Sequence, residues 1–345
     1  MRWRSQRLVQ VLAGRCYALT RISGFADRGC SAFTGPLIAA ANRIKADLYI
    51  AHYPAALPAA ALAARQHGAR YAFDAEDFHL GDYPEGPAQD TLRGMIRAVE
   101  GRYLPGAAYV TAASPGIADA YAESYGVPRP TVVLNVFPLS QAPAGPTLSG
   151  TAEPGPSVYW FSQTIGPDRG LECAVRAIAR ARSRPHLYLR GSLAAGFLER
   201  LREIAAEVGV ADHLHVLPPA MPSEMERLAA VYDVAFSGEP SHTPNNRIAL
   251  GNKLFSNLLA GLPLIVSMVP SHCVFAEDFV PAVQLYPVDD VDALAKTLDG
   301  LLLSPTRLAQ ARAAAFKLGQ NRFNWEREQT VVLDIVRRAT KETEQ

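Results

Sequence analysis

The chain has 345 residues, of which 49% are hydrophobic and 19% are charged, and its formal net charge is +1 at pH 7. This length exceeds what one ordinary core holds and predicts two domains, while the apolar content excludes a largely disordered chain. The balanced charge excludes a global basic field of the kind that binds nucleic acid, so we expect a small-molecule substrate.

The first segment, residues 1–45, predicts helices and carries eight Arg and Lys residues against a single acid, Asp27. Apolar residues lie between these charges. Two interpretations stay open: a basic amphipathic helix in peripheral contact with anionic lipid at the inner membrane face, or an ordinary solvated helix face.

From residue 47 onward, short β-rich runs alternate with helical stretches, which is typical of a parallel sheet covered by helices. In the first half the pattern predicts strands at 48–53, 70–75, 108–112 and 131–136, with helices at 58–67 and 91–102. Gly68 predicts the end of the first helix. Ser114 and Pro115 predict the start of another, as N-cap and first-turn residues.

A stretch rich in Pro, Gly, Ser and Thr, residues 138–156, predicts a linker between two domains. In the second half we expect strands at 158–162, 186–190, 213–217, 234–237 and 262–267, and helices at 171–182, 195–208, 252–259 and from 291 onward. Ser223 and Glu226 have the spacing of a capping box, which predicts a helix from there to Val231.

The four cysteines, Cys16, Cys30, Cys173 and Cys273, are scattered along the chain. They lack the paired spacing of a zinc site or a redox dithiol, and reduced thiols are typical of a cytoplasmic protein. No apolar run is long enough to span a bilayer, and the N-terminus shows no signal-peptide pattern. We therefore expect a cytoplasmic location.

Residues 252–263 read Asn-Lys-Leu-Phe-Ser-Asn-Leu-Leu-Ala-Gly-Leu-Pro. This segment resembles the donor-site helix of retaining GT-B-fold glycosyltransferases of family 4 (glycosyl transferases group 1). Other segments resemble the same family in the same order, namely 46–52, 73–77 and 111–114 in its N-terminal domain and 161–172, 187–191 and 232–237 in its C-terminal domain. The resemblance covers residues 46 to 340 approximately.

The resemblance implies an α/β fold with two Rossmann-like domains, of which the N-terminal one is incomplete. We expect the acceptor-side domain at 46–137, after the basic segment 1–45, and the donor-binding domain at 157–322, after the linker 138–156. A C-terminal helix at 323–345 is expected to pack back toward the N-terminal domain.

The resemblance also implies a hexosyltransferase-type enzyme that acts in polysaccharide or glycolipid assembly. It would move a sugar, with retention of configuration, from a UDP- or GDP-linked donor to a carbohydrate or lipid-linked acceptor. No cofactor is expected. No metal is expected either, because no Asp-x-Asp carboxylate pair is predicted on a loop and the histidines lack ligand spacing.

Several residues of the second half are candidates for binding the donor. The start of a helix at Asn252 can hold a diphosphate through backbone N–H groups. Gly166 would form the turn, and Arg169 and Lys253 would add positive charge against the leaving group, although surface cations would look the same. Arg190 ends a strand, where it could contact the ligand or form an interdomain salt bridge.

One departure concerns the ribose. Where the family has a glutamate that grips the ribose, this chain has Ser256, and the partner glutamate is replaced by Ile248. A hydroxyl cannot offer the two acceptor oxygens of a carboxylate, so we expect weaker nucleotide binding. Glu239 and Asn246 in the preceding loop could contact the sugar, or could belong to an ordinary polar loop.

On the acceptor side, many relatives place a histidine that points at the sugar, and Glu76 stands at that position here. Together with Asp74 and His79 it could orient an acceptor hydroxyl or act as its base. Chance surface carboxylates would give the same pattern.

A second departure lies at the start of the chain. Relatives open with a strand, a glycine-rich loop and further strands, whereas residues 1–45 predict helices, so at most four strands are expected in the first sheet. Two alternatives to an active transferase stay open. One is a catalytically silent relative that binds a nucleotide sugar or a partner, and the other is a GT-B-type nucleotide-sugar epimerase.

Overall fold

The computed structural model describes residues 2–84, 86–146 and 155–341. The chain divides into two compact units. Unit 1 consists of Met1–Leu134, His242–Ala249 and Thr330–Gln345, and unit 2 of Asn135–Ser241 and Leu250–Gln329. The predicted linker 138–156 falls in unit 2, and its residues 147–154 lie outside the described residues.

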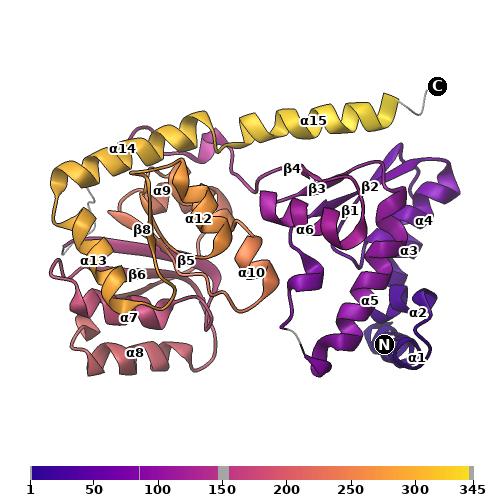
Figure 1. Ribbon diagram of the computed structural model, residues 1–345, viewed down its shortest axis with the longest axis horizontal. Helices are drawn as coiled ribbons and strands as arrows, with labels where there is room; N and C mark the ends of the chain where they lie inside the picture. The colour runs from indigo at the N-terminus through magenta and orange to yellow at the C-terminus, as the bar shows by residue number, and fades with distance from the viewer. Residues whose placement is uncertain (1, 85, 147–154, 342–345) are drawn as a thin grey trace. The chain divides into compact units, whose positions relative to one another are not determined.

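Unit 1 is built on a parallel sheet of four strands in the order β1-β2-β3-β4 (Figure 1). The strands are β1 (Leu48–His52), β2 (Arg70–Ala75), β3 (Val110–Ala112) and β4 (Thr131–Val132). The helices are α1 (Arg2–Thr20), α2 (Ser23–Gly29), α3 (Thr34–Ala41), α4 (Leu57–His67), η1 (His79–Gly81), α5 (Pro87–Tyr103), η2 (Leu104–Gly106), α6 (Pro115–Tyr125) and α10 (Pro244–Ile248). The prediction of a helical opening followed by four strands is confirmed.

Local sequence signals set two helix ends in unit 1. Ser114 accepts a hydrogen bond from the Ile117 backbone N–H at 3.1 Å, and Pro115 follows it, so α6 begins as predicted. Gly68 has a left-handed backbone with φ 66°, which ends α4 as predicted.

Unit 2 is a six-stranded parallel sheet in the order β10-β9-β8-β5-β6-β7. The strands are β5 (Ser157–Ile165), β6 (His186–Leu193), β7 (Leu214–Leu217), β8 (Val234–Ser237), β9 (Leu264–Ser267) and β10 (Val283–Tyr286). The helices are η3 (Leu139–Gln141), α7 (Leu171–Arg180), α8 (Phe197–Glu207), η4 (Ala211–His213), η5 (Pro222–Glu224), α9 (Met225–Ala229), α11 (Asn252–Leu259), α12 (Pro270–Glu277), α13 (Val291–Leu302) and α14 (Pro305–Asn321). The last helix, α15 (Trp325–Lys341), begins in unit 2, and its residues from Thr330 onward belong to unit 1.

The strand order makes unit 2 a doubly wound Rossmann-like sheet. The chain starts at β5, adds β6 and β7 on one side, and then returns to add β8, β9 and β10 on the other. The order therefore reverses between β5 and β8, and ligands of such sheets bind outside the carboxyl ends of the strands at this switch point. The predicted α/β class is confirmed for both units.

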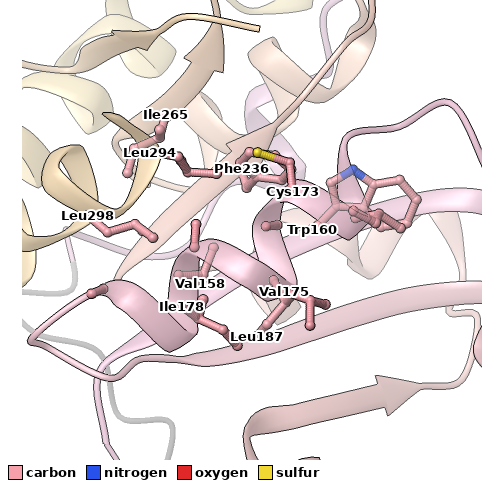
Figure 2. Packing of buried hydrophobic residues seen from close by; sticks show 14 of the residues in the cluster. Val158, Trp160, Cys173, Val175, Ile178, Leu187, Phe236, Ile265, Leu294 and Leu298 are labelled. Atoms are coloured by element: carbon pink, nitrogen blue, oxygen red, sulfur yellow. The ribbon is translucent and has the colours of Figure 1, made fainter. Parts of the chain in front are cut away.

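The core of unit 2 lies between one face of its sheet and the helices packed on it. Figure 2 shows Trp160 of β5, Leu187 of β6 and Phe236 of β8 with Ile178 of α7 and Leu298 of α13, all essentially buried. Burying each large apolar side chain contributes about 1.5–3 kcal/mol. This packing gives the loops at the carboxyl edge of the sheet a rigid base.

The predicted capping box is wrong. α9 begins after Glu224 without a side-chain cap, and Ser223 lies in the short η5 instead. Glu226 is fully buried and accepts a hydrogen bond from the Ser256 hydroxyl at 2.7 Å. The carboxylate that would have capped α9 therefore joins α9 to α11.

Among the described residues, none of the helices combines the length and the apolar character needed to cross a bilayer.

Gly170 sets the loop between β5 and α7. Its φ is 67°, and a Cβ at this position would lie 2.7 Å from the carbonyl oxygen of Gly238, which follows β8. A side chain would thus be strained by the backbone conformation and would also collide with backbone. The two glycines let the loops after β5 and β8 touch.

We expect Gly170→Ala to lower the free energy of unfolding by more than Gly196→Ala. Gly196 also has a left-handed backbone, with φ 73°, but open space around it, so it reports only the cost of that conformation, about 1–2 kcal/mol. The collision at Gly170 adds about 1–3 kcal/mol. Urea unfolding of both variants measures the difference, and equal losses would show that the contact with Gly238 relaxes freely.

Candidate functional site

Two predicted cations meet one carboxylate at the switch point of unit 2. Lys253 Nζ lies 2.6 Å from Glu239 Oε1, and Arg169 Nη1 lies 3.6 Å from Glu239 Oε2. Arg169 stands in the loop after β5, Glu239 in the loop after β8, and Lys253 in the first turn of α11. The structure thus places Arg169 and Lys253 on the same side of unit 2. We call these three residues the donor-side cluster.

Burial and charge in the donor-side cluster favour an anion. The Lys253 side chain is 10% exposed and its ammonium lies 5.2 Å from the Trp160 ring centroid, whereas Arg169 is 43% exposed. Burial alone would raise the pKa of Glu239, but Lys253 and then Arg169 outweigh it and lower that pKa. Glu239 therefore stays ionised. Within the cluster the positive charges outnumber the negative by one.

The N-terminus of α11 adds a further source of positive potential. Its N-cap residue, Gly251, has an extended backbone, and no side chain within the described part of the chain caps this end. Asn252 is the first helical residue, and the helix matches the predicted range 252–259. Uncapped N–H groups and the helix dipole together favour a phosphate at this end.

Gly166 directly follows β5 and opens the loop that carries Arg169. A side chain here would lie at ordinary contact distance, 3.4 Å, from the Ala194 Cβ. The glycine is therefore placed in the loop as predicted, but the structure does not require it as strictly as it requires Gly170.

Two predicted donor residues serve the interior instead. Arg190 is 8% exposed; its Nε donates to the Tyr159 hydroxyl and its Nη1 to the Pro218 carbonyl, both at 3.0 Å. Its Nε and Nη1 groups are thus engaged within unit 2. Ser256 is fully buried, and its hydroxyl donates to Glu226 Oε1 at 2.7 Å.

The segment that carries Asn246 belongs to unit 1. Asn246 accepts a hydrogen bond from Thr243 Oγ1 at 2.8 Å at the start of the short α10. Its neighbour Asn245 is 8% exposed, donates to Asp77 Oδ1 at 2.8 Å and accepts from the Phe78 N–H at 2.9 Å. Asn245 therefore holds the loop after β2. It lies 168 positions from Asp77 in the sequence, so no local pattern predicted this contact.

In unit 1, His52 joins the two predicted carboxylates. His52 Nδ1 lies 3.1 Å from Asp74 Oδ2 and 3.1 Å from Glu76 Oε1. The register pairs His52 at the end of β1 with Asp74 near the end of β2. Sequence reasoning missed His52 as a site residue. The available signal was its position at the end of a strand whose parallel neighbour carries Asp74.

His79 was predicted to belong with these carboxylates, and this is wrong. It is 3% exposed, and its Nδ1 lies 2.8 Å from the Tyr121 hydroxyl and 3.3 Å from Glu100 Oε1. Glu100 is fully buried and also accepts from the hydroxyls of Tyr121 and Tyr125. His79 thus completes a polar cluster in the interior, where η1 turns the side chain inward.

Asp82, in the loop after η1, carries a raised pKa. Burial, followed by repulsion from Asp77, raises the pKa of Asp82 to about 6. The folded state therefore binds this proton more tightly than the unfolded state. Its contribution to the free energy of unfolding is therefore fully present at low pH and is lost as the pH rises through about 6.

We expect Asp82→Asn to raise the free energy of unfolding by about 1–2 kcal/mol at pH 7.5, less than the full shift implies because the side chain is only partly buried. Below pH 3.8, the ordinary pKa of an aspartate, the Asp82 carboxyl is mostly neutral in the folded and the unfolded wild-type chain alike, so the gain should largely disappear. Chemical unfolding at the two pH values tests this, with the exposed Glu123→Gln as the matched control. A gain that does not depend on pH would contradict the electrostatic cause.

Part of the chain is similar to a known family of domains. Residues 3–136 match the family described as "Glycosyl transferase 4-like domain". The match begins within α1, so it includes the helices of the segment 1–45, which the sequence motifs had left outside the resemblance. It covers less than half of the chain. No curated protein sequence matches the chain.

Solved structures extend the comparison beyond residues 3–136. HepE from Anabaena, solved with UDP-glucose, has a TM-score of 0.70 and 18% identity, covering 90% of this chain and 82% of its own. Sucrose-phosphate synthase from Thermosynechococcus elongatus gives 0.71 and 17%, covering 89% and 77%. A glycosyltransferase from Rickettsia africae gives 0.68 and 15%, covering 90% and 80%. Such similarity shows the fold, and that fold is GT-B.

Proposed function

We propose that the protein is a glycosyltransferase that moves a sugar from a nucleotide-sugar donor to a carbohydrate or lipid-linked acceptor, with retention of configuration. The observation that carries this proposal is the donor-side cluster: Arg169 and Lys253 converge on Glu239 at the switch point, beside the uncapped start of α11. HepE has been solved with UDP and with UDP-glucose, which favours a UDP-linked donor.

The charges of the cluster suit the departure of a nucleoside diphosphate. Negative charge grows on the diphosphate as the sugar leaves, and fixed cations and N–H groups stabilise that charge without reorganising. Arg169 and Lys253 supply the cations, and α11 supplies the N–H groups. Glu239 holds both cations in place before the donor arrives, and its carboxylate can accept hydrogen bonds from sugar hydroxyls.

The acceptor is assigned to unit 1. His52, Asp74 and Glu76 are 52%, 29% and 38% exposed, so an acceptor hydroxyl can reach them. A carboxylate or imidazole of these residues can orient the acceptor hydroxyl and take its proton. In this proposal no protein nucleophile forms a covalent intermediate.

Removing either cation should weaken UDP binding. We expect Arg169→Ala and Lys253→Ala each to cost about 1.5–3 kcal/mol, as for a hydrogen bond to a charged group. Isothermal titration calorimetry with UDP measures the loss, and Lys296→Ala, an exposed cation on α13, is the control. The Arg169 side chain is much more exposed than that of Lys253, so Arg169→Ala still tests the site if Lys253→Ala unfolds. Losses of UDP binding free energy below about 0.3 kcal/mol at both positions would show that neither residue binds the diphosphate.

Turnover assays with UDP-glucose distinguish the proposal from its two alternatives. A transferase releases UDP faster when a sugar acceptor is added. Binding without any turnover would favour a catalytically silent relative, and conversion of the donor sugar without an acceptor would favour an epimerase. The anomeric configuration of the product, measured by NMR, tests retention.

We also propose that α1–α3 contact an anionic membrane at the cytoplasmic face. Large apolar side chains are exposed on these helices and the loops that join them, at Leu8, Val11, Leu12, Leu19, Ile22 and Phe33. Exposed basic residues lie among them, including Arg4, Arg15 and Arg28. Apolar burial together with attraction to anionic lipid is the pattern of interfacial helices.

The protein should float with vesicles that contain phosphatidylglycerol and should remain below pure phosphatidylcholine vesicles. Charge reversal at Arg4 and Arg15 should abolish flotation, because it replaces attraction with repulsion. The same reversal at Lys296 and Lys317, exposed in unit 2, is the matched control. Equal flotation with vesicles that contain phosphatidylglycerol and with pure phosphatidylcholine vesicles would contradict the proposal.

A further inference from the structure

We propose that His52, Asp74 and Glu76 form a binding site for one divalent transition-metal ion of the zinc or manganese type. The metal site uses the same three residues as the proposed acceptor site, but its test needs no glycosyl transfer, and it adds a ligand that the sequence did not predict. Each residue offers one ligand atom, and the three atoms lie within 4.8 Å of one another.

The spacing of the ligand atoms fits a small cation. Zinc binds nitrogen and carboxylate oxygen at about 2.0–2.2 Å, so adjacent ligand atoms of a tetrahedral site lie ~3.4 Å apart. His52 Nδ1 is 3.1 Å from Asp74 Oδ2 and 3.1 Å from Glu76 Oε1. Shifts of a few tenths of an ångström therefore bring these two distances to the tetrahedral value, and the remaining pair of ligand atoms lies within 4.8 Å.

The backbone holds these ligands in advance of binding. β1 and β2 are paired in register, so His52 and Asp74 are neighbours across the sheet, and Glu76 follows just after β2. Thr111, paired with Asp74 on β3, donates its hydroxyl to Asp74 Oδ1 at 2.6 Å. This bond fixes the carboxylate and leaves Oδ2 facing His52, which is how an outer hydrogen bond orients a metal ligand.

The charges at the site also favour a cation. Two carboxylates converge on one ring nitrogen, and among the described residues His52 is the basic group paired with them. A neutral imidazole can satisfy them only through a single N–H group, whereas a divalent ion would neutralise both carboxylates. Partial exposure of all three side chains leaves room for water as a further ligand, as in zinc sites with an open position.

The ligand types select the metal class. Imidazole suits zinc and other transition metals, whereas carboxylates also suit manganese and magnesium, so a mixed set favours zinc or manganese over calcium. The spacing of residues along the chain did not predict this site. Its ligands come from two separate segments, one ending β1 and one ending β2, whereas the spacing test considered ligands within one segment.

The full chain, stripped with EDTA, is titrated with ZnCl₂ and separately with MnCl₂ against a chromophoric chelator. We expect one equivalent of zinc per chain. Glu76→Gln and His52→Ala should each weaken zinc binding at least tenfold, and Thr111→Val, which keeps the shape of the side chain, should weaken it ~10-fold through the outer hydrogen bond. Glu76→Gln changes a partly exposed group and keeps its size, so it remains informative if another variant unfolds.

Two controls separate this site from other zinc-binding groups. The His186 and His215 rings approach to 2.9 Å in unit 2, and the thiols of Cys16, Cys30, Cys173 and Cys273 are free. Alanine at both histidines, and serine at the cysteines, should leave the zinc stoichiometry unchanged. A crystal grown with zinc should show an anomalous peak in contact with His52, Asp74 and Glu76.

The opposite results would overturn the inference. They are an absence of stoichiometric binding, a wild-type affinity in His52→Ala and Glu76→Gln, or loss of binding only in the control variants. None of these measurements uses enzymatic turnover, so failure of the metal site and failure of the proposed transferase activity are distinguishable.

Discussion

The pairing of Lys253 and Arg169 with Glu239 is the interaction on which the donor side depends. A nearly buried ammonium is unfavourable unless a counter-charge lies against it, and Glu239 supplies that charge at 2.6 Å. The pairing exists because Gly170 and Gly238 let the loops after β5 and β8 touch, which places the residues beside them, Arg169 and Glu239, within reach. Backbone contact therefore comes first, and the charge arrangement follows from it.

One property of parallel sheets explains both clusters. All strands of each sheet end at the same edge, so side chains that follow different strands meet there even when they are far apart in sequence. In unit 2 the reversal of strand order between β5 and β8 opens a place for a ligand. Unit 1 has a sequential order without such a reversal among its described strands, and its cluster instead arises from the register of β1 with β2.

The sequence predicted what is encoded locally and missed what depends on contacts between distant segments. The range of α11, the cap at Ser114 and the end at Gly68 each rest on a few adjacent residues. The burial of His79 depends on Glu100 and Tyr121, which no local pattern reveals. The strand β10 and the helices α10 and α12 were also missed, because each is short and takes its stability from packing rather than from propensity.

Ser256 shows how a departure from a family pattern can be accommodated. Burial raises the pKa of Glu226, and the hydrogen bond from Ser256 works in the opposite direction. The hydroxyl that the resemblance placed at a ribose instead donates to one oxygen of a buried carboxylate, Oε1 of Glu226, between α9 and α11. In the proposed function, donor recognition therefore draws on the diphosphate more than on the ribose. Because charged contacts dominate such recognition, its strength should depend on ionic strength more than a carboxylate–ribose grip would.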